Sequence, residues 1–514
     1  MKKIPFILFV FSALSLSGQS ITYFNKLIFP WVSTNHLTSI APLGNDFLVL
    51  SGWVDTPYYY NQSPSLIHLS AQGNILNQRL YLDTTHYYYF SPANSLVATS
   101  DSTFVMAGYR WNNTNGVCPF LMRVDGNLDT IRTRVFSHPD TLAASVPGAY
   151  IVNKFTCIRE TWDKGFILSG YYNPGCNTTN TERSYLLKLD SLFNVQWIKK
   201  YSNVGISFNV ETTADSGYYF VSMSQVNQIY KYDKYGNLEW QVNTNLSPPF
   251  VGSSGPVDLK VYNQNTLYVA SGYWVEPVYG RRGFLLSKVD IPTRSVVWEK
   301  YFIMFNHNKC LTLDQHIRLL IATDSNLIVC ANSLMPNPLD SSVISHKGII
   351  AKLSPNGDSL WARHLGYGDF QYNNQINDII MTNDGGFMMI GIFADWHPGI
   401  MYEDAWIVKT DSLGCDTPGC HLIGVEELKI RNEKLEIFPN PFGAEMQVEL
   451  PEEFGDGMLV MYDVQGRRVV EADAPAGYAQ GSFTVQTGHL MPGVYLVELA
   501  GKDGRVWRRK AVKK

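Results

Sequence analysis

The chain has 514 residues, more than one hydrophobic core usually serves, so several domains or an array of repeats are expected. Charged residues make up 17% and aromatic residues 13%, a balance that favours half-buried strands and an all-β fold. The formal net charge of −4 gives no electrostatic case for nucleic acid or an anionic membrane, since both require a concentrated basic surface. We therefore expect no nucleic-acid partner.

The first residues predict a secretory signal peptide at 1–19. Lys2 and Lys3 precede an apolar run from Ile4 to Leu16, and small or polar residues follow it. The run is too short to span a bilayer, and no later stretch approaches about 18 consecutive apolar residues, so we expect no transmembrane helix in the mature protein. No Cys follows the run, which argues against a lipid anchor. A buried first helix is the alternative, but the order of charged pair, apolar run and polar exit favours a signal peptide.

Between residues 21 and 414 one pattern recurs seven times. Each copy begins with a polar turn and an apolar strand that ends on a small residue, at 45–52, 101–108, 163–170, 215–222, 265–272, 324–331 and 384–391. A second strand follows after a loop, usually carries a basic residue and closes on a turn, at 65–70, 120–125, 185–190, 228–233, 284–290, 349–354 and 405–411. A third strand tends to centre on Trp, as at Trp197, Trp298 and Trp361, and a weaker fourth strand leads into the next copy.

The repeat predicts a seven-bladed β-propeller. Successive small residues are 50 to 62 residues apart, which suits four strands with generous loops, and four-stranded units repeated around an axis leave few open sheet edges. Glycines such as Gly385 and Gly386 permit positive φ in tight hairpins, and the glycine at the strand end allows close approach of a neighbouring backbone. A stack of separate sandwiches is the alternative, but it would need more than four strands in each period.

Counting strands predicts how the ring closes. The seventh copy stops at Asp411 with no Trp-centred strand after it, whereas the N-terminus has one strand too many, at 23–29. This extra segment is similar to 196–201, the Trp-centred strand of the third copy. We therefore predict that residues 23–29 pair beside 406–410 and complete the last blade.

Beyond Cys420 the composition changes. A Cys-containing linker at 415–432 is followed by 433–514, a segment without the repeat. Its alternating strands are expected at 435–438, 446–450, 458–462, 468–470, 482–486, 494–499 and 505–512. Seven short strands separated by turns predict a small β-sandwich.

Three ordered motifs and a basic end give this tail a family resemblance. The motifs are Leu-Glu-Ile-Phe-Pro-Asn-Pro-Phe at 435–442, Met-Tyr-Asp-Val-Gln-Gly-Arg-Arg at 461–468 and Leu-Met-Pro-Gly-Val-Tyr-Leu-Val-Glu-Leu at 490–499. They resemble the type A C-terminal sorting domain of the type IX secretion system of Bacteroidota. Pro492 and an insert-like stretch at 471–480 depart slightly from the plainest pattern, which affects loop details.

The resemblance implies an immunoglobulin-like sandwich that an outer-membrane translocon recognises after passage through the general secretion machinery and the periplasm. The tail is then usually cut off, and the cargo is released or attached to an anionic lipopolysaccharide at the cell surface. The residues that carry the resemblance are Phe438, Pro439, Asn440, Pro441, Gly466, Gly493, Tyr495, Lys510, Lys513 and Lys514. The family exposes its terminal basic strand to the export machinery. The same residues can also be explained by the folding of a sandwich, and both interpretations can hold together.

The seven cysteines suggest one disulfide. Cys415 and Cys420 are close enough in sequence to be proposed as a pair, which would stiffen the junction after the propeller. The partners of the other five are left open: Cys118, Cys157, Cys176, Cys310 and Cys330.

No catalytic, cofactor or metal site is predicted. Common motifs for metalloproteases, serine hydrolases, P-loops and dinucleotide binding are absent from the sequence. The Asp residues of the hairpins are attributed to turn structure rather than calcium, because no turn has the dense Asp ladder of a calcium loop. Five histidines near the last repeats are expected to be surface or structural residues: His307, His316, His346, His364 and His397.

Two tyrosine runs are candidate ligand contacts. They comprise Tyr58, Tyr59 and Tyr60, and Tyr87, Tyr88 and Tyr89. Tyrosine offers an apolar face with a polar tip, which suits a glycan or protein ligand, although packing between blades would also explain the runs.

Two functions remain open. The favoured one is an exported binding or scaffold propeller, and the alternative is a polysaccharide hydrolase or lyase. The alternative requires carboxylates or a His from several blades to converge at the mouth of the central channel.

Overall fold

The computed structural model describes most of the chain. The described residues are 23–29, 35–54, 62–83, 85–91, 93–112, 116–136, 152–173, 183–201, 206–223, 227–244, 250–275, 281–303, 317–337, 340–369, 372–395, 402–417, 420, 429–430, 435–449, 457–463, 467–474, 482–501 and 506–514. The expected signal peptide, the tyrosine run 58–60 and Gly466 lie outside them, as do Cys176 and Cys310.

The described residues form strands and no α-helix. No helix long and apolar enough to cross a membrane occurs among them. The strands belong to two compact units, of which the first contains seven sheets and the second contains two.

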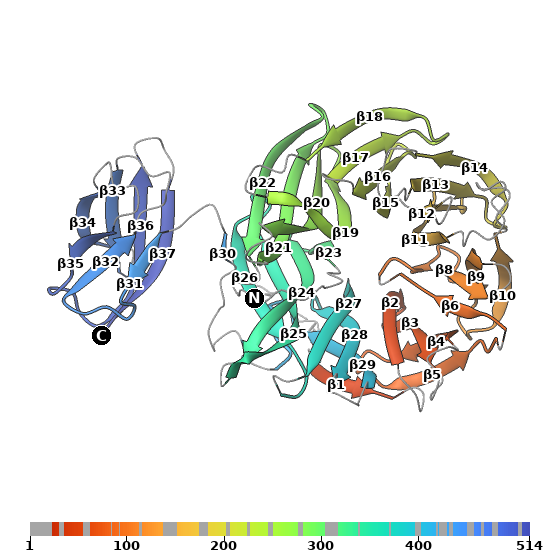
Figure 1. The fold of residues 1–514 in the computed structure, drawn as a ribbon, viewed down its shortest axis with the longest axis horizontal. Coiled ribbons are helices and arrows are strands. Elements are labelled where there is room, and N and C mark those ends of the chain that lie inside the picture. Colours follow the sequence, from red (N-terminus) through yellow and green to blue (C-terminus); the bar gives the residue numbers. More distant parts are fainter. Residues whose placement is uncertain are drawn as a thin grey trace, which may run out of the picture. The chain divides into compact units, whose positions relative to one another are not determined.

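The seven sheets of the first unit are propeller blades, arranged in a ring in Figure 1. Blade 1 comprises β2 (Asn35–Leu43), β3 (Asp46–Val54), β4 (Gln62–Leu69) and β5 (Ile75–Leu80). Blade 2 comprises β6 (Tyr87–Tyr89), β7 (Leu96–Ala98), β8 (Phe104–Asn112), β9 (Gly116–Val124) and β10 (Thr130–Val135), with β6 and β7 both paired to β8. Blade 3 comprises β11 (Val152–Glu160), β12 (Phe166–Asn173), β13 (Arg183–Leu189) and β14 (Val195–Lys200).

The remaining blades repeat this order from the inner to the outer strand. Blade 4 comprises β15 (Ile206–Thr212), β16 (Tyr218–Met223), β17 (Asn227–Tyr232) and β18 (Leu238–Asn243). Blade 5 comprises β19 (Phe250–Asn263), β20 (Thr266–Val275), β21 (Arg281–Asp290) and β22 (Ser295–Ile303). Blade 6 comprises β23 (Arg318–Ile321), β24 (Leu327–Asn337), β25 (Asp340–Leu353) and β26 (Ser359–Leu365). Blade 7 comprises β27 (Asn373–Met381), β28 (Phe387–Asp395), β29 (Tyr402–Thr410) and β1 (Phe24–Ile28).

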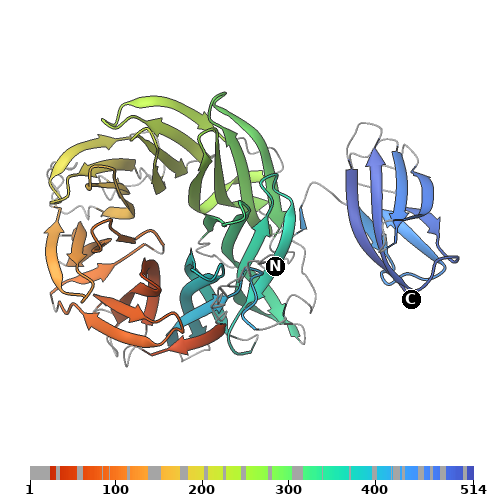
Figure 2. The same cartoon turned by 180° about the vertical axis from the view of Figure 1, so that it is seen from behind.

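The ring closes between its first and last strands, which lie side by side in Figures 1 and 2. β1 pairs antiparallel with β29, and Leu27 lies opposite Trp406. The Trp406 indole N–H also donates to Asn25 Oδ1 at 2.8 Å. This is the pairing expected from the strand count, and it gives the outer edge of β29 the backbone partner that an exposed edge would lack.

The core of the propeller lies between consecutive blades. Side chains alternate between the two faces of each strand, so each blade packs one face on the blade before it and the other on the blade after it. The contact between blades 6 and 7, for example, buries Trp361, Phe387, Met389 and Trp406.

The second strands of the blades are longer than predicted. They continue past the small residue at which the sequence pattern placed their ends, as β28 does beyond Gly391. That glycine marks a bulge in the neighbouring β27, where the register shifts between Ile376 and Asp378. A Cβ at Gly391 would lie 1.8 Å from Gln375 O, so the backbones approach too closely for any side chain.

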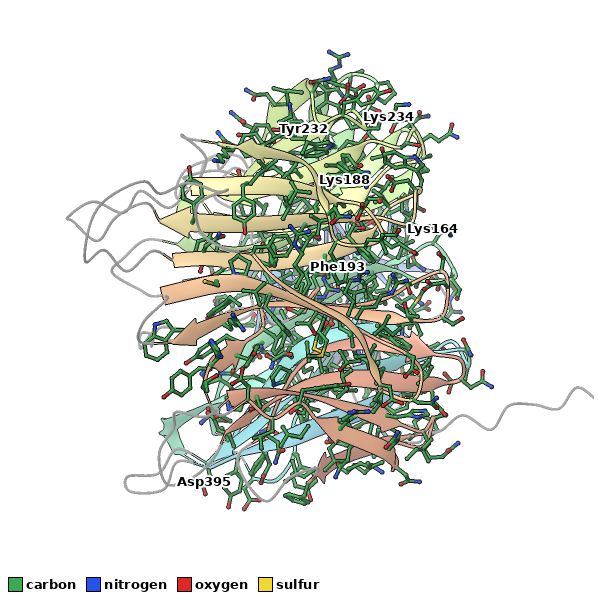
Figure 3. The ribbon with its side chains drawn as sticks, turned by 90° about the vertical axis from the view of Figure 1, so that its right-hand side faces the viewer. Lys164, Lys188, Phe193, Tyr232, Lys234 and Asp395 are labelled. Carbon is green, nitrogen blue, oxygen red and sulfur yellow. A yellow bond between two sulfur atoms is a disulfide. The ribbon has the colours of Figure 1, made fainter. Side chains whose placement is uncertain are left out.

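The strands have a turn end and a connection end. The turn end carries the tight turns between the first and second strands and between the third and fourth strands of each blade. Lys164 and Lys234 lie in such turns, on the right of Figure 3, whereas Asp395 at the end of β28 lies on the opposite side, which we name the connection end.

The second unit is a two-sheet sandwich. One sheet contains β31 (Glu436–Phe438), β32 (Glu445–Glu449) and β35 (Ser482–Gln486), and the other contains β33 (Gly457–Tyr462), β34 (Arg468–Ala474), β36 (Gly493–Gly501) and β37 (Val506–Lys513). A two-residue strand, β30 (Lys429–Ile430), precedes them. Phe442, Met446, Leu459 and Val497 are among the fully buried residues of the core. The seven predicted strands of the tail are confirmed, with ends that differ by a few residues.

Candidate functional site

The tyrosine run 87–89 forms β6 at the connection end of blade 2, where it pairs with the last residues of β8. Tyr87 stacks on Trp111 with ring centroids 5.0 Å apart, and Tyr89 stacks on Tyr109 at 5.1 Å. All four rings are partly exposed. Stacking on a neighbour limits the motion of each ring, so these aromatic faces are held in place before any ligand arrives.

Lys154 on β11 extends this row into blade 3. Its ammonium lies 4.6 Å from the ring centroid of Tyr109 and 5.9 Å from that of Tyr171, its partner in the β11–β12 register. A cation near the faces of two rings is attracted by their quadrupoles. We name the following residues the aromatic patch: Tyr87, Tyr89, Tyr109, Trp111, Lys154 and Tyr171.

Tyr88 does not belong to the patch, because successive residues of a strand face opposite sides. It is 7% exposed, packs edge-on against Phe120 in the core and donates a hydrogen bond to Asp83 Oδ2 at 2.7 Å. Burial and this hydrogen bond raise the pKa of Tyr88 to about 12. Tyr88 is therefore a packing residue, whereas Tyr87 and Tyr89 present partly exposed rings.

The patch can bind through ring faces and hydroxyl groups. Burial raises the pKa values of Tyr89 and Tyr109, so both phenols remain protonated at neutral pH. Protonated phenols can donate hydrogen bonds, and their rings present flat apolar surface. This combination suits a sugar ring, which has one apolar face and hydroxyl groups at its edge, or a protein side chain.

Buried side chains recur at one position along the inner edge of the seven blades, and hydrogen bonds or ion pairs join several of them across neighbouring blades. Each of these residues occupies the same position in its blade, and the next residue in the chain is a buried aliphatic one. We name the following residues the axial ring: Ser39, Ser95, Cys157, Asn209, Asp258, Arg318 and Asp378. Sequence reasoning missed it, because residues of five different types give no repeated motif.

Arg318 is the charged centre of the axial ring. Its Nη1 lies 2.8 Å from Asp258 Oδ2 and its Nε lies 2.8 Å from Asp378 Oδ1. Asp378 Oδ2 also accepts hydrogen bonds from Ser39 Oγ and Ile40 N in blade 1, both at 3.1 Å. Burial alone would lower the pKa of Arg318, but the two carboxylates outweigh burial and raise it. The guanidinium therefore stays charged and ties blade 6 to blades 5 and 7.

A second ionic cluster lies next to the ring on the same inner strands. Arg159 Nη2 lies 2.9 Å from Glu211 Oε1, and Lys260 contacts the same carboxylate. Burial by itself would raise the pKa of Glu211, but the charges and hydrogen bonds of Arg159 and Lys260 lower it to about 2. Glu211 is therefore ionised at neutral pH and cannot act as a proton donor there.

Carboxylates from blades 4, 5 and 7 thus lie on the inner strands, whereas the hydrolase or lyase alternative requires such groups at the mouth of the central channel. Asp258, Asp378 and Glu211 are each paired with a cation. A catalytic acid needs a pKa near the working pH, and a nucleophile needs access to substrate. Asp258 and Asp378 are buried and therefore lack access to substrate, and the lowered pKa of Glu211 leaves it without a proton to donate at neutral pH, so the arrangement favours a role in holding the blades together.

The turn carboxylates bind backbone amides. Asp411 Oδ1, for example, accepts hydrogen bonds from the N–H groups of Leu413 and Cys415 at 2.8 and 2.9 Å. The same geometry, in which one side-chain oxygen accepts hydrogen bonds from two backbone N–H groups, recurs at Asp125, Asp190 and Asp233, and with a serine hydroxyl at Ser70 and Ser354. This accords with the assignment of these residues to turn structure.

The basic residue of the third strand has a structural role. It forms an ion pair with the Asp of the turn between the first and second strands of its own blade; in blade 7, Lys409 Nζ lies 2.9 Å from Asp384 Oδ2. The ion pairs are Arg123–Asp101, Lys188–Asp163, Lys231–Asp215, Lys352–Asp324 and Lys409–Asp384, and in blade 1 His68 Nε2 lies 3.1 Å from Asp46 Oδ2. The spacing of Asp and Lys in the repeat was a usable signal for these pairs.

Within the described part of the chain, no group of three or more His, Cys, Asp and Glu residues could hold a metal ion. Of the five histidines near the last repeats, His346 and His364 are described, on β25 and β26. His346 is buried, and its Nδ1 lies 3.3 Å from Gln375 Nε2. His307, His316 and His397 lie outside the described residues.

The sorting motif and the C-terminal strand of the sandwich are bonded to each other. Asn440 Oδ1 accepts a hydrogen bond from Val512 N at 2.9 Å, and Phe442 N donates to Val512 O at 2.8 Å. Tyr495 belongs to the third motif. The centroids of its ring and the Phe442 ring are 6.2 Å apart, and its hydroxyl donates a hydrogen bond to Met491 O at 2.6 Å. Segments about 70 residues apart thus form one structural group.

The basic residues at the C-terminus differ in exposure. Lys510 and Lys514 are exposed, whereas Lys513 is 9% exposed, lies over the Phe442 ring at 5.5 Å and donates to Gly443 O. The sequence does not distinguish the three lysines, but the structure assigns Lys513 a packing contact within the sandwich.

Cys415 and Cys420 form a disulfide with Cα atoms 5.5 Å apart, just after the last propeller strand. Cys157 and Cys330 are buried thiols whose pKa values are raised by burial. Neither has the exposed, electropositive environment that makes a thiol reactive.

The C-terminal tail matches a known protein family. Residues 436–514 match the family described as Secretion system C-terminal sorting domain. This match covers the sandwich and leaves the propeller unassigned. No curated protein matches the chain.

Several solved structures are similar to the chain at low sequence identity. A protein of unknown function from Bacteroides caccae is 12% identical over 65% of this chain and 94% of its own, with a TM-score of 0.33. The β-propeller domain of the Trilobed protease from Pyrococcus furiosus is 8% identical over 75% of this chain and 100% of its own, with a TM-score of 0.37. A puromycin-hydrolyzing peptidase from Mycobacterium tuberculosis is 12% identical over 84% of this chain and 61% of its own, with a TM-score of 0.41. Similarities this distant carry no information on function.

Proposed function

We propose that this chain, a type IX-sorted secreted protein with a propeller fold, is a binding module whose ligand contacts the aromatic patch. The patch supports the proposal because it combines partly exposed ring faces with hydroxyl and ammonium donors on adjacent strands. Tyr87, Tyr89 and Trp111 belong to blade 2, and Lys154 and Tyr171 belong to blade 3. A glycan is the ligand that this chemistry favours, since the apolar face of a sugar can pack on the aromatic rings and its hydroxyl oxygens can accept hydrogen bonds from the donors.

We also propose the export route of the chain and the boundaries of its domains. Residues 1–19 direct the chain through the general secretion machinery into the periplasm, and residues 433–514 direct it through the outer-membrane translocon. Residues 21–414 form the exported propeller, with a linker at 415–432. Whether the propeller is released or attached to the surface depends on processing of the tail.

A glycan panel tests the binding function. The purified mature chain is expected to retain at least one polysaccharide without cleaving it. Tyr87→Ala and Trp111→Ala should each weaken retention by roughly 2- to 12-fold, the equivalent of about 0.5–1.5 kcal/mol for a lost aromatic contact.

The matched control is Tyr235→Ala, which removes a tyrosine that is 63% exposed in a turn of blade 4. It should leave retention unchanged. Retention that is insensitive to both patch substitutions would exclude the patch as the glycan site, and binding to a protein partner alone would replace the glycan as the ligand. The ion pairs of Glu211, Asp258 and Asp378 give the hydrolase or lyase alternative no support, and release of shorter saccharides would reinstate it.

A further inference from the structure

A recess opens between blades 2 and 3, separate from the aromatic patch. Strands β9 and β10 of blade 2, the residue that follows β10, and strands β11, β13 and β14 of blade 3 contribute its lining residues. Its empty volume, including the open mouth, is about 510 Å³. Its walls combine apolar side chains, among them Phe136, Phe155, Leu187 and Val195, with polar groups.

Two aromatic rings shape the apolar part of the recess. Phe136 and Phe155 meet edge-to-face with centroids 5.5 Å apart, and both are buried. Val195 also lines the recess and is 45% exposed, so it borders the mouth rather than the base. An apolar ligand that enters here would exchange water contact for contact with these side chains.

A buried amide provides one polar group. Asn153 is 1% exposed, and its Oδ1 accepts the Tyr185 hydroxyl at 2.8 Å. Burial keeps the pKa of Tyr185 well above its usual value, so that hydroxyl remains a donor. The Nδ2 group of Asn153 is a hydrogen-bond donor among the lining residues of the recess. A ligand oxygen would accept a hydrogen bond from it.

A cation provides the second polar group. The Arg134 guanidinium lies 4.9 Å from the ring centroid of Phe136 and donates to Phe193 O in a turn of blade 3. Within the described residues it contacts no carboxylate. An uncompensated guanidinium that lines an apolar recess favours a ligand with a carboxylate, which guanidinium groups bind with charge-assisted hydrogen bonds.

We propose that this recess binds a small aromatic carboxylate. The ring of the ligand packs between Phe136, Phe155 and Val195, and its carboxylate accepts hydrogen bonds from Arg134 and from the Asn153 amide. The site does not involve the aromatic patch, so it stands independently of the proposed glycan function.

The test uses the mature full-length chain and phenylacetate as the probe, with binding measured by ligand-observed NMR titration. Wild-type protein should bind phenylacetate and should bind the uncharged phenylacetamide roughly tenfold more weakly. Arg134→Gln should weaken phenylacetate binding by a similar factor and leave phenylacetamide binding nearly unchanged. Val195→Phe fills the mouth and should abolish binding of both probes.

Two matched controls accompany these variants. Arg132→Gln changes another arginine of β10 that donates to a backbone carbonyl of the same turn, at Leu192. Leu238→Phe enlarges an exposed aliphatic residue on the outer strand of blade 4, which is 52% exposed. Both should bind phenylacetate as wild type does, and all four variants should unfold at the wild-type midpoint.

Three results would overturn the proposal. They are no saturable binding of phenylacetate by the wild-type chain, equal effects of Arg134→Gln and Arg132→Gln, and unchanged binding by Val195→Phe. Trp111→Ala separates the two sites, because it should reduce glycan retention and leave phenylacetate binding intact. Failure of the glycan test with normal phenylacetate binding would reject the aromatic patch alone.

Discussion

Asp378 lies in blade 7. It accepts hydrogen bonds from Ser39 and Ile40 of blade 1 and forms an ion pair with Arg318 of blade 6. A single carboxylate therefore connects three blades. Two of them are blades 1 and 7, where the beginning and the end of the propeller chain meet. Because it is 2% exposed, loss of its charge would leave Arg318 with half of its compensation in a site that water does not reach.

Asp378→Asn should therefore destabilise the propeller by about 3 kcal/mol. Denaturant unfolding followed by tryptophan fluorescence measures the change. Asp129→Asn is the control. The Asp129 side chain is 63% exposed and pairs with Arg79, so this substitution should have little effect on stability. Equal stability of the two variants would show that the axial ring contributes nothing.

Glu211 makes stability depend on pH. Its pKa is about 2 in the folded protein, below its ordinary value of 4.5, so the unfolded chain binds a proton on this group more readily than the folded chain does. The stability that it contributes is present above pH 4.5 and is lost as the pH falls toward 2. Glu211→Gln should flatten the fall in unfolding free energy across this window, measured by urea titrations at several pH values. An unchanged slope would contradict the assigned role.

At the scale of elements, the blades depend on neighbours rather than on their own sheets. Each core cluster is shared by two blades, so an isolated blade would leave both of its faces exposed. Strand β1 closes the ring. It joins the N-terminal part of the chain to blade 7, and its residue Ile28 is buried against blade 1.

Leu27→Pro should open the ring at this strand. Proline cannot donate a ladder hydrogen bond and restricts φ, so the pairing of Leu27 with Trp406 would be lost. We expect a lower unfolding midpoint and faster exchange of the β29 amides, measured by hydrogen exchange. Phe29→Ala changes a residue that is 64% exposed just beyond β1 and should leave both quantities unchanged. Slow exchange in Leu27→Pro would contradict closure by β1.

At the scale of the whole molecule, the two units have separate tasks. The tail matches a sorting family and is sufficient to explain export, whereas the proposed ligand sites both lie in the propeller. The two units also have separate cores, since the sandwich cluster contains only residues from 435 onward.

Removal of residues 436–514 should therefore block export without unfolding the propeller. In a host with a functional type IX system, the shortened chain should accumulate inside the outer membrane, and its amount at the surface and in the medium should fall at least tenfold by immunoblot. The purified shortened chain should retain the glycan and phenylacetate binding of the full-length chain. Undiminished export would contradict the assignment of the tail.

The sequence by itself determined the features that depend on local patterns. Alternating apolar residues and turn residues located the strands, the sevenfold repeat indicated the blades, and the strand count placed residues 23–29 beside the last blade. These inferences succeed because strand alternation and hairpin turns are set by residues close together in the chain.

Only the tertiary structure decided which distant side chains meet. Asp258, Arg318 and Asp378 are 60 residues apart in succession, and their different residue types conceal their equivalent positions. The separation of Tyr88 from its neighbours and the recess between blades 2 and 3 likewise depend on which face of a strand packs against the next blade. Such contacts arise from the closure of the ring, which brings together groups that no local motif relates.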